Sequence, residues 1–414
     1  LNVVAQSQRV DLSSFIGVGQ ELGILENFDR EWRFSHDLLH EEVCAALGPE
    51  QCERLHLAIA RSLLTAYPGS TEHSSRLAFH FEAANRPVEA VCHHLRAAEH
   101  ALQIDAAKTA LDHVDRILRL LPDDAMPSLT ELSCQRLIAH ANYLLARFYD
   151  CVQALSAAES SLAKLRGRLR VRQSVDSFTG RVLDREQLNA EEILMLRAGE
   201  SYVWVGQRMT FVRRTVCAFP RLYREPRMPG MLCFFLGMLV AEVGALGPAV
   251  RFIDLGQQVH RLRGFEIGVF EAYRIRATLQ IRQGKWNLVE RDLDALIQWG
   301  HQHGSLFRTI QAVFMRFTLH LSCNRLGLAE QTAAQLRVET ERSGIEEYLL
   351  GSALAEARIA FRRGNCSSAL ERLERAQKHS GRPKESALWS SYSALFACIL
   401  ARCGDVSAFL AAVQ

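Results

Sequence analysis

Several kinds of chemistry are excluded by what this 414-residue chain lacks. It has eleven cysteines but no CxxC pair, and the nearest spacings are Cys44/Cys52 and Cys398/Cys403. A scattered, odd set of this kind is typical of reduced thiols in a cytosolic protein. The formal net charge is only +3, which gives no reason to expect nucleic acid or an anionic membrane as the main partner. We therefore expect a cytoplasmic protein that contacts neither directly.

Long apolar runs and catalytic motifs are also missing. The longest apolar run, Met231 to Ala241, is about half the length that spans a bilayer, so we expect an inner helix there and no membrane segment. No nucleophile motif and no Walker A sequence GxxxxGK[ST] occurs, and the pair His36/His40 lacks a third zinc ligand. The sequence thus predicts no catalytic residues, no metal and no cofactor in this chain, which argues against an enzyme.

The most informative feature present is a glycine that returns about every forty residues. The series is Gly206, Gly247, Gly284, Gly327, Gly364 and Gly404, at intervals of 41, 37, 43, 37 and 40. Such a period is typical of an α-solenoid of helix pairs, in which each unit buries its apolar face only against its neighbours. Arrays of this kind usually bind or sense a partner.

The unit around Gly364 shows the repeat most clearly. The pair Gly364-Asn365 suits a helix-ending turn, and Ala369, Leu370, Leu373 and Ala376 then follow at helical spacing. The pattern GNxxxALxxLxxA resembles the second helix of a tetratricopeptide repeat. We therefore expect an all-α, tetratricopeptide-like solenoid.

Residues 1–67 follow a different rule. Asp11 to Gly23 has a helical pattern, and 24–28 and 31–34 look like two short strands around a turn. Ser35 can then cap a helix that begins at His36. Helix, hairpin, helix is the end of a winged-helix domain, so we expect a partial winged helix before the solenoid.

The remaining chain divides by its helical pattern. We expect helices at about 72–85, 87–102, 105–121, 128–147 and 150–166, with Pro87 in a first turn and Asp105 as an N-cap. The arginine-rich segment 165–188 is interpreted as a solvated loop, with phosphate contact as the alternative. The predicted domains are 1–67, a partial winged helix; 68–125, a linker with the first helix pairs; and 126–414, a superhelical sensor domain. Because the sequence starts at Leu1 and ends within a helical pattern, we expect a piece of a longer protein.

A family resemblance rests on the N-terminal hundred residues. The run WRFSHDLLHEEV at 32–43 is followed by Arg54-Leu55-His56, by LAFHFEAA at 77–84 and by LRAAE at 95–99. This succession resembles signal-transduction ATPases with numerous domains, the class of the maltose-type and LuxR-tailed activators. In related plant and animal receptors the motif Met-His-Asp places its histidine on the β-phosphate of ADP. Ser35, His36 and Asp37 match it at two of three positions.

The resemblance implies a nucleotide and a regulatory role. Because the chain has no P-loop, the ADP- or ATP-binding domain would lie upstream in the same protein. The fragment would then be a sensor that receives an inducer or a protein partner and holds the ATPase autoinhibited, with oligomerisation on activation. The alternative is a stand-alone tetratricopeptide scaffold that binds a peptide or protein and has no link to a nucleotide.

The predicted binding groove is lined by aromatic and cationic side chains. We expect it on the inner helices between about residues 190 and 400, at Arg197, Trp204, Phe235, Tyr273, Arg274, Arg276 and Phe314. Aromatic walls with a few cations suit a small anionic inducer or an acidic peptide. The alternative interpretation is that the aromatics are inter-helix core and the arginines are solvated.

Overall fold

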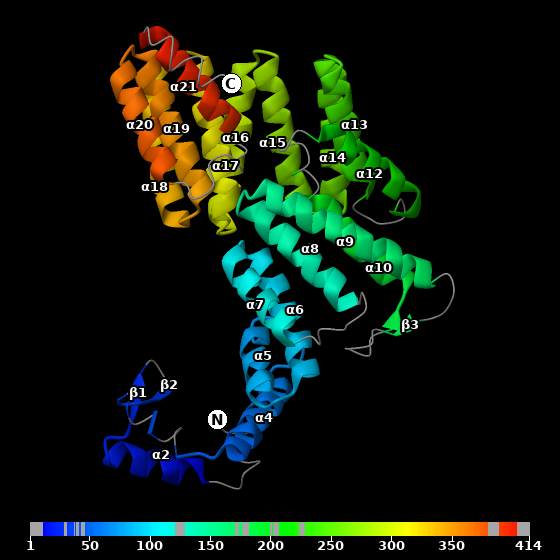
Figure 1. Cartoon of the computed structure of the whole chain (residues 1–414), viewed down its shortest axis with the longest axis vertical. Helices are drawn as coiled ribbons and strands as arrows, with labels where there is room; N and C mark the ends of the chain where they lie inside the picture. Colours follow the sequence, from blue (N-terminus) through cyan, green and yellow to red (C-terminus); the bar gives the residue numbers. More distant parts are fainter. Residues whose placement is uncertain are drawn as a thin grey trace. The chain divides into compact units, whose positions relative to one another are not determined.

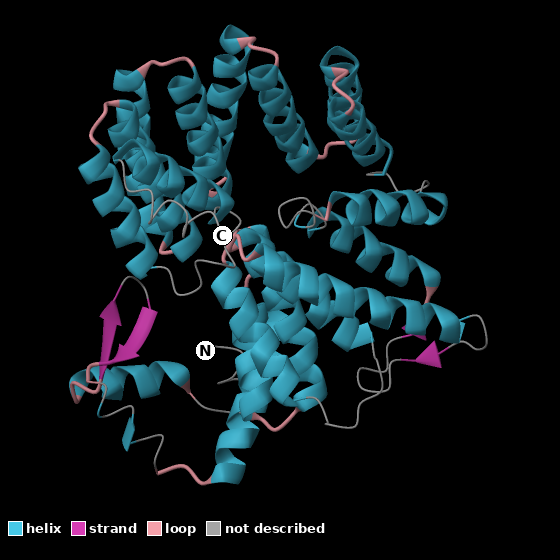
Figure 2. Ribbon diagram, turned by 45° about the horizontal axis from the view of Figure 1, so that its top comes forward, coloured by secondary structure: helices cyan, strands magenta, loops and turns pink. Residues whose placement is uncertain are grey.

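The computed structural model describes residues 11–28, 31–36, 38, 41–42, 46–120, 129–169, 174–175, 182–198, 201, 207–222, 228–379 and 389–403. These residues form eighteen α-helices and two small two-stranded sheets (Figure 2), which confirms the predicted all-α solenoid with a short hairpin. The second sheet pairs β3 (Ser174–Val175) with β4 (Val182–Leu183). None of the described helices has the length and hydropathy needed to cross a bilayer.

The chain divides into two compact units. Unit one comprises residues 1–103, 108–137 and 175–182, and unit two comprises 104–107, 138–174 and 183–414. Each unit is described below by itself.

Unit one begins with a helix and a hairpin. Helix α2 (Leu12–Glu21) is capped by Asp11, whose carboxylate accepts the backbone N–H groups of Ser13 and Ser14. Strands β1 (Leu25–Phe28) and β2 (Glu31–Phe34) pair antiparallel, with Leu25 opposite Phe34. The predicted hairpin is thereby confirmed, whereas the winged-helix domain stays a prediction.

Five further helices follow, and the last four agree with the expected ranges to within a few residues. They are α4 (Pro49–Ala66), α5 (Ser74–Ala83), α6 (Pro87–Gln103), α7 (Ala107–Leu120) and α8 (Leu129–Leu144). Pro87 opens α6 as expected, because a first helical position needs no N–H donor. The N-cap expected at Asp105 is wrong. Asp105 has φ +57°, the left-handed conformation of a residue that follows a helix end, and an N-cap is extended.

Unit two holds the regular repeats. Its helices are α9 (Phe148–Leu169), α10 (Arg185–Ala198), α12 (Arg208–Leu222), α13 (Met228–Glu242), α14 (Leu246–Leu262), α15 (Glu266–Arg282), α16 (Trp286–Gln302), α17 (Leu306–Ser322), α18 (Leu326–Ser343), α19 (Glu346–Arg362), α20 (Cys366–His379) and α21 (Trp389–Cys403). Figure 1 shows α13 to α20 running side by side in alternating directions. From α14 to α20 the helix starts are twenty residues apart, so one helix pair occupies forty.

The twenty-residue spacing originates in the turns. A residue with positive φ recurs at each of them: Gly244, Gly264, Gly284, Gly304, Asn324, Gly344 and Gly364. At Gly264 the glycine N–H donates to the Arg261 carbonyl, and the next N–H, of Phe265, donates to that of His260. This pair of bonds closes the helix end and requires a left-handed residue, which glycine or asparagine supplies at low cost.

The predicted forty-residue repeat is present, but its glycines do not all have the same role. Gly284 and Gly364 are turn residues, whereas Gly247 and Gly327 lie in the first turns of α14 and α18. Gly206 and Gly404 fall outside the described residues. The turns recur every twenty residues, and the sequence pattern sampled two different positions of the repeat.

The helices of unit two form two layers. Ala249, Val289, Ala329 and Ala369, forty residues apart on the even-numbered helices α14 to α20, are each fully buried. Small side chains here let neighbouring helices approach closely. Successive odd-numbered helices from α13 to α21 also contact one another, whereas successive even-numbered helices make no comparable contact in the described residues. The odd-numbered helices are therefore on the crowded, inner side of the array.

One contact within unit two joins residues about 200 positions apart. The Asp105 carboxylate accepts a hydrogen bond from the Ser305 hydroxyl and faces the Arg308 guanidinium at 3.7 Å. Nearby turns meet as well: the Tyr143 ring lies 5.4 Å from that of Phe307. The Tyr348 hydroxyl donates to the Leu144 carbonyl at 3.3 Å. In a simple solenoid each repeat contacts only its neighbours, so these contacts are an addition to the repeat pattern.

Candidate partner-binding face

The ion pairs of α19 identify the side of this helix that faces the even-numbered layer. Glu356 pairs with Arg337 on α18 and with Arg372 on α20, so its side chain points towards the even-numbered layer. An α-helix turns by about 100° per residue, which places Arg358 on the opposite side of α19. We call this side of the odd-numbered helices the inner face. Its members include Glu271, Arg274 and Thr278 on α15, Gln311, Phe314 and Thr318 on α17, and Arg358 and Arg362 on α19. Thr278, Thr318 and Arg358 are at equivalent positions, forty residues apart.

Two of the predicted groove residues lie on the inner face. The Arg274 Nε donates to the Glu271 carboxylate at 2.7 Å, an ion pair within α15. Phe314 is half-buried, with its ring centroid 6.2 Å from that of Phe317 in the core. For these two side chains, the ligand-binding role stays a prediction.

Two other predicted groove aromatics pack between helices. The ring of Phe235 meets that of Phe211 edge to face at 4.8 Å. Tyr273 packs against the core of α15 to α19, and its hydroxyl accepts a hydrogen bond from Arg261 at 2.7 Å. Trp204 and the side chain of Arg197 lie outside the described residues.

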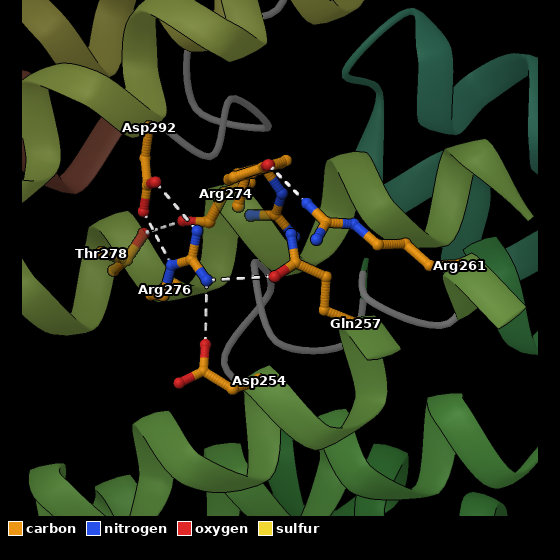
Figure 3. Close-up of polar contacts among 8 residues, drawn as sticks. Asp254, Gln257, Arg261, Arg274, Arg276, Thr278 and Asp292 are labelled. Atoms are coloured by element: carbon orange, nitrogen blue, oxygen red, sulfur yellow. Dashed lines mark hydrogen bonds and ion pairs between the residues drawn. The ribbon is translucent and has the colours of Figure 1, made fainter. Parts of the chain in front are cut away.

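Arg276 is two residues from Arg274, which places it on the opposite side of α15. Figure 3 shows its guanidinium between Asp254 and Asp292. Its guanidinium makes two hydrogen bonds of 2.8 Å with Asp292 of α16. Its Nη1 donates to Asp254 at 2.9 Å and to Gln257 at 3.1 Å, both on α14. These bonds raise the Arg276 pKa beyond its already high value, and the charge is fully compensated inside the protein. Its place in the predicted groove is therefore not supported by these contacts.

The same arrangement recurs eighty residues later with its charges reversed. Gln257, Arg276 and Asp292 correspond by position to Arg337, Glu356 and Arg372. In both sets an odd-numbered helix places one charged side chain between two even-numbered neighbours. The sign of the central charge differs between the two sets, but in both it pairs with the opposite charge on a neighbouring helix. We therefore assign Arg276 and Glu356 to contacts between helices. The sequence alone could not separate the two arginines, because Arg274 and Arg276 are equally plausible as ligand-binding residues.

The predicted nucleotide-sensing residues lie beyond the hairpin. The Ser35 hydroxyl donates to the Gly23 carbonyl at 2.5 Å, and its backbone N–H donates to the Ile24 carbonyl at 2.9 Å. Ser35 thus ties the end of β2 to the end of α2. His36 is exposed, and Asp37 lies outside the described residues. The nucleotide-sensing role of the three residues stays a prediction.

Unit one contains a buried histidine pair that the sequence pattern did not single out. His94 Nδ1 and His113 Nδ1 are 2.9 Å apart, and His94 Nε2 is 3.1 Å from a Glu82 oxygen. A carboxylate only accepts, so neutral His94 carries its proton on Nε2 and accepts at Nδ1 from the Nδ1–H of His113. Burial lowers the pKa of His94, and it lowers the pKa of His113 to about 4.

A second histidine contact lies one helix pair earlier. The Nδ1 atoms of His56 on α4 and His80 on α5 are 2.9 Å apart, and burial lowers the pKa of His80 to about 4. Across the described part of the chain, no group of three or more His, Cys, Asp or Glu side chains is arranged to hold a metal ion. Each of the two contacts joins adjacent helices, α6 with α7 and α4 with α5.

Comparisons with known proteins do not identify a family for this chain. No family model matches the chain, and no curated protein matches it. A Rap protein complexed with the competence and sporulation factor is 11% identical, with TM-score 0.48, over 83% of this chain and 90% of the other. The Rap conjugation gene regulator of plasmid pLS20, in complex with the Phr* peptide, is 12% identical, with TM-score 0.49, over 83% and 88%.

A third solved structure is similar over most of this chain. The signal-transduction ATPase with a tetratricopeptide repeat sensor from Pyrococcus horikoshii is 12% identical, with TM-score 0.41. The match covers 92% of this chain and 60% of that protein. At these identities and TM-scores the matches assign neither a family nor a function to this chain, and no site residue is transferred from these proteins.

Proposed function

We propose that this chain is a helical-repeat binding module that takes a peptide or protein segment along its inner face. One observation carries the proposal: the inner face presents a mixed set of polar, cationic and aromatic side chains, whereas the Arg276 and Glu356 networks already occupy the opposite sides of the same helices. The described residues offer no arrangement that we can assign to catalysis. We therefore propose binding as the function, and that this chain has no enzymatic activity and needs no cofactor.

The test is a selection of binding peptides followed by blocking of the face. Peptides selected from a random library against the purified chain are titrated by calorimetry against the wild type and two variants. Thr318→Trp fills the inner face of α17, and we expect it to weaken binding at least about tenfold. Val338→Trp on α18 is the matched control, because Val338 is 60% exposed and lies outside the inner face.

The outcomes separate the alternatives. Loss of affinity in Thr318→Trp alone, with unchanged circular dichroism and melting temperature, supports the inner face. Equal loss in both variants, or loss only in Val338→Trp, would place the binding surface elsewhere. A library that yields no binder to the wild-type chain would contradict the function itself.

A second candidate is the sensor region of a signal-transduction ATPase, with the nucleotide-binding domain upstream. It is favoured by the helix and hairpin of α2, β1 and β2, followed by Ser35 and an exposed His36. A histidine in this place is available to a phosphate group supplied by another domain. In the full-length protein, we expect His36→Ala to accelerate release of a fluorescent ADP analogue. Wild-type release, or the lack of a P-loop upstream in the gene, would contradict this candidate.

A further inference from the structure

Among the buried and half-buried arginines of the described chain, one differs from all the others. Eight of nine lie against a carboxylate: Arg136, Arg166, Arg214, Arg274, Arg276, Arg308, Arg316 and Arg372. The ninth, Arg358, is half-buried and makes no hydrogen bond, ion pair or ring contact in the described structure. Burial alone lowers its pKa, and no nearby acid opposes this effect.

The position of Arg358 is on the inner face of α19. The equivalent residues one and two repeats earlier are Thr318 and Thr278, whose hydroxyls donate to carbonyls of their own helices. Threonine side chains are short and uncharged, so Arg358 has the only long, charged side chain of these three equivalent positions. A charge that is partly removed from water without a partner is destabilising, which makes this placement costly for folding alone.

Two further arginines lie at the same end of α19. Arg362 is exposed one turn beyond Arg358, and neither residue has an acidic partner in the described structure. The Arg402 guanidinium of α21 lies over the Phe361 ring, 5.5 Å from its centroid. We call Arg358, Arg362 and Arg402 the basic corner.

We propose that Arg358 anchors an acidic peptide segment on the inner face, by a paired hydrogen bond between its guanidinium and a carboxylate of the peptide. The inference rests on the proposed binding function and specifies its ligand. Guanidinium and carboxylate match as planar, two-bond partners, and partial burial strengthens the pair relative to one in water. Arg362 and Arg402 supply charge for neighbouring carboxylates, so successive acidic residues fit better than a single one.

A defined probe tests the proposal. A fluorescein-labelled hexaglutamate peptide is titrated by fluorescence anisotropy at low ionic strength, with hexaglutamine as the neutral probe. We expect hexaglutamate to bind the wild type and Arg358→Gln to weaken it at least about tenfold. Arg358→Lys keeps the charge but loses the fork, so its affinity should fall between the two.

The matched control is Arg363, which directly follows the last residue of α19. Arg363→Gln also removes one positive charge, but Arg363 is already paired with Glu330 at 2.7 Å, so we expect less than about a twofold change. Arg358→Gln should also leave the melting temperature unchanged or raised, because it removes an uncompensated charge. A lowered melting temperature would indicate a structural role and contradict the proposal.

The remaining outcomes decide between peptide and free anion. If inorganic phosphate displaces hexaglutamate at comparable concentration, the site takes a small anion and the peptide assignment is wrong. If hexaglutamate does not bind, or binds Arg358→Gln as tightly as wild type, Arg358 is not the anchor. Library-selected peptides that still require the inner face in that case would leave the proposed binding function intact.

Discussion

At the residue scale, the buried histidines of unit one make its stability depend on acid. His113 faces His94 and lies near Asp112 and Arg116 of its own helix, while Glu82 of α5 holds the far side of His94. In the neutral pair the proton of His113 Nδ1–H already lies between the two Nδ1 atoms, so an extra proton has to enter at His113 Nε2. Protonation of both rings would set two N–H groups against each other at 2.9 Å, which the buried site opposes.

We therefore expect unit one to lose stability as the pH falls from about 6.5 to about 4. The folded pKa of His113 is about 4 against an ordinary value of 6.5, so over this range the unfolded chain binds protons that the folded chain does not. In His113→Gln the glutamine amide can still donate to His94. The variant should lose less free energy of unfolding over this pH range than the wild type, by up to about 2–3 kcal/mol. Urea denaturation at several pH values measures it.

The control for this prediction is His100→Gln on α6. His100 is only half-buried and makes no bond to the pair. Its substitution should leave the pH dependence of stability unchanged. A wild-type slope in His113→Gln would show that other groups, such as His80 and His93, carry the acid sensitivity.

At the scale of helices, α13 and α14 pack with little room between them. A Cβ added to Gly256 would lie 2.9 Å from the Gly230 carbonyl oxygen and 2.6 Å from a Phe234 ring carbon. A Cβ on Gly237 would lie 2.7 Å from a methyl carbon of Ile253. At Gly256 the close atom is a backbone oxygen, which cannot move aside as the end of the Ile253 side chain can, so Gly256 is the position that requires glycine.

We expect Gly256→Ala to destabilise the protein by about 1–3 kcal/mol, since a backbone oxygen cannot move away without separating the helices. Gly247→Ala is the contrasting variant. Gly247 lies in the first turn of α14, and a Cβ added there would have nothing within 4 Å, so alanine should stabilise by about 0.5 kcal/mol. Thermal unfolding of both variants tests this, and equal effects would contradict the packing argument.

At the scale of the whole molecule, the contact of Asp105 with Ser305 and Arg308 gives unit two a link that a repeat array does not need. The Asp105 and Arg308 side chains are only 7% and 11% exposed, so the carboxylate compensates a charge that water reaches poorly. Its loss would leave Arg308 buried beside Ser305 without a counter-charge. The turn at 104–107 would then lose its attachment to the start of α17.

We expect Asp105→Asn to lower the free energy of unfolding by about 1–3 kcal/mol. Asparagine tolerates the left-handed backbone, so the effect reports the lost charge and not strain. Hydrogen exchange of the backbone amides at 306–309 and 143–147 should accelerate together. Asn85→Asp, the reverse change at the left-handed turn twenty residues earlier, should alter stability by less than about 0.5 kcal/mol. Unchanged exchange at both segments would contradict a long-range link.

Much of the architecture could be predicted because its causes are local. Gly364-Asn365 ends a helix, Ala369 and Leu373 bury one side of the next, and the hairpin of residues 25–34 follows from two short apolar strands around a turn. Each of these signals depends on residues within a few positions of one another. The repeat and the all-α class therefore follow from the sequence by itself.

The tertiary structure alone decided which charged side chains are compensated. Arg274, Arg276 and Arg358 are equivalent as residues, yet one pairs within its helix, one bridges two neighbouring helices and one has no acidic partner in the described structure. The physical reason is that helix periodicity sets the side of a helix on which a residue lies, whereas pairing depends on what the next helices bring to that side. The link between Asp105 and Ser305, about 200 residues apart, is decided in the same way, because no local pattern encodes the contact.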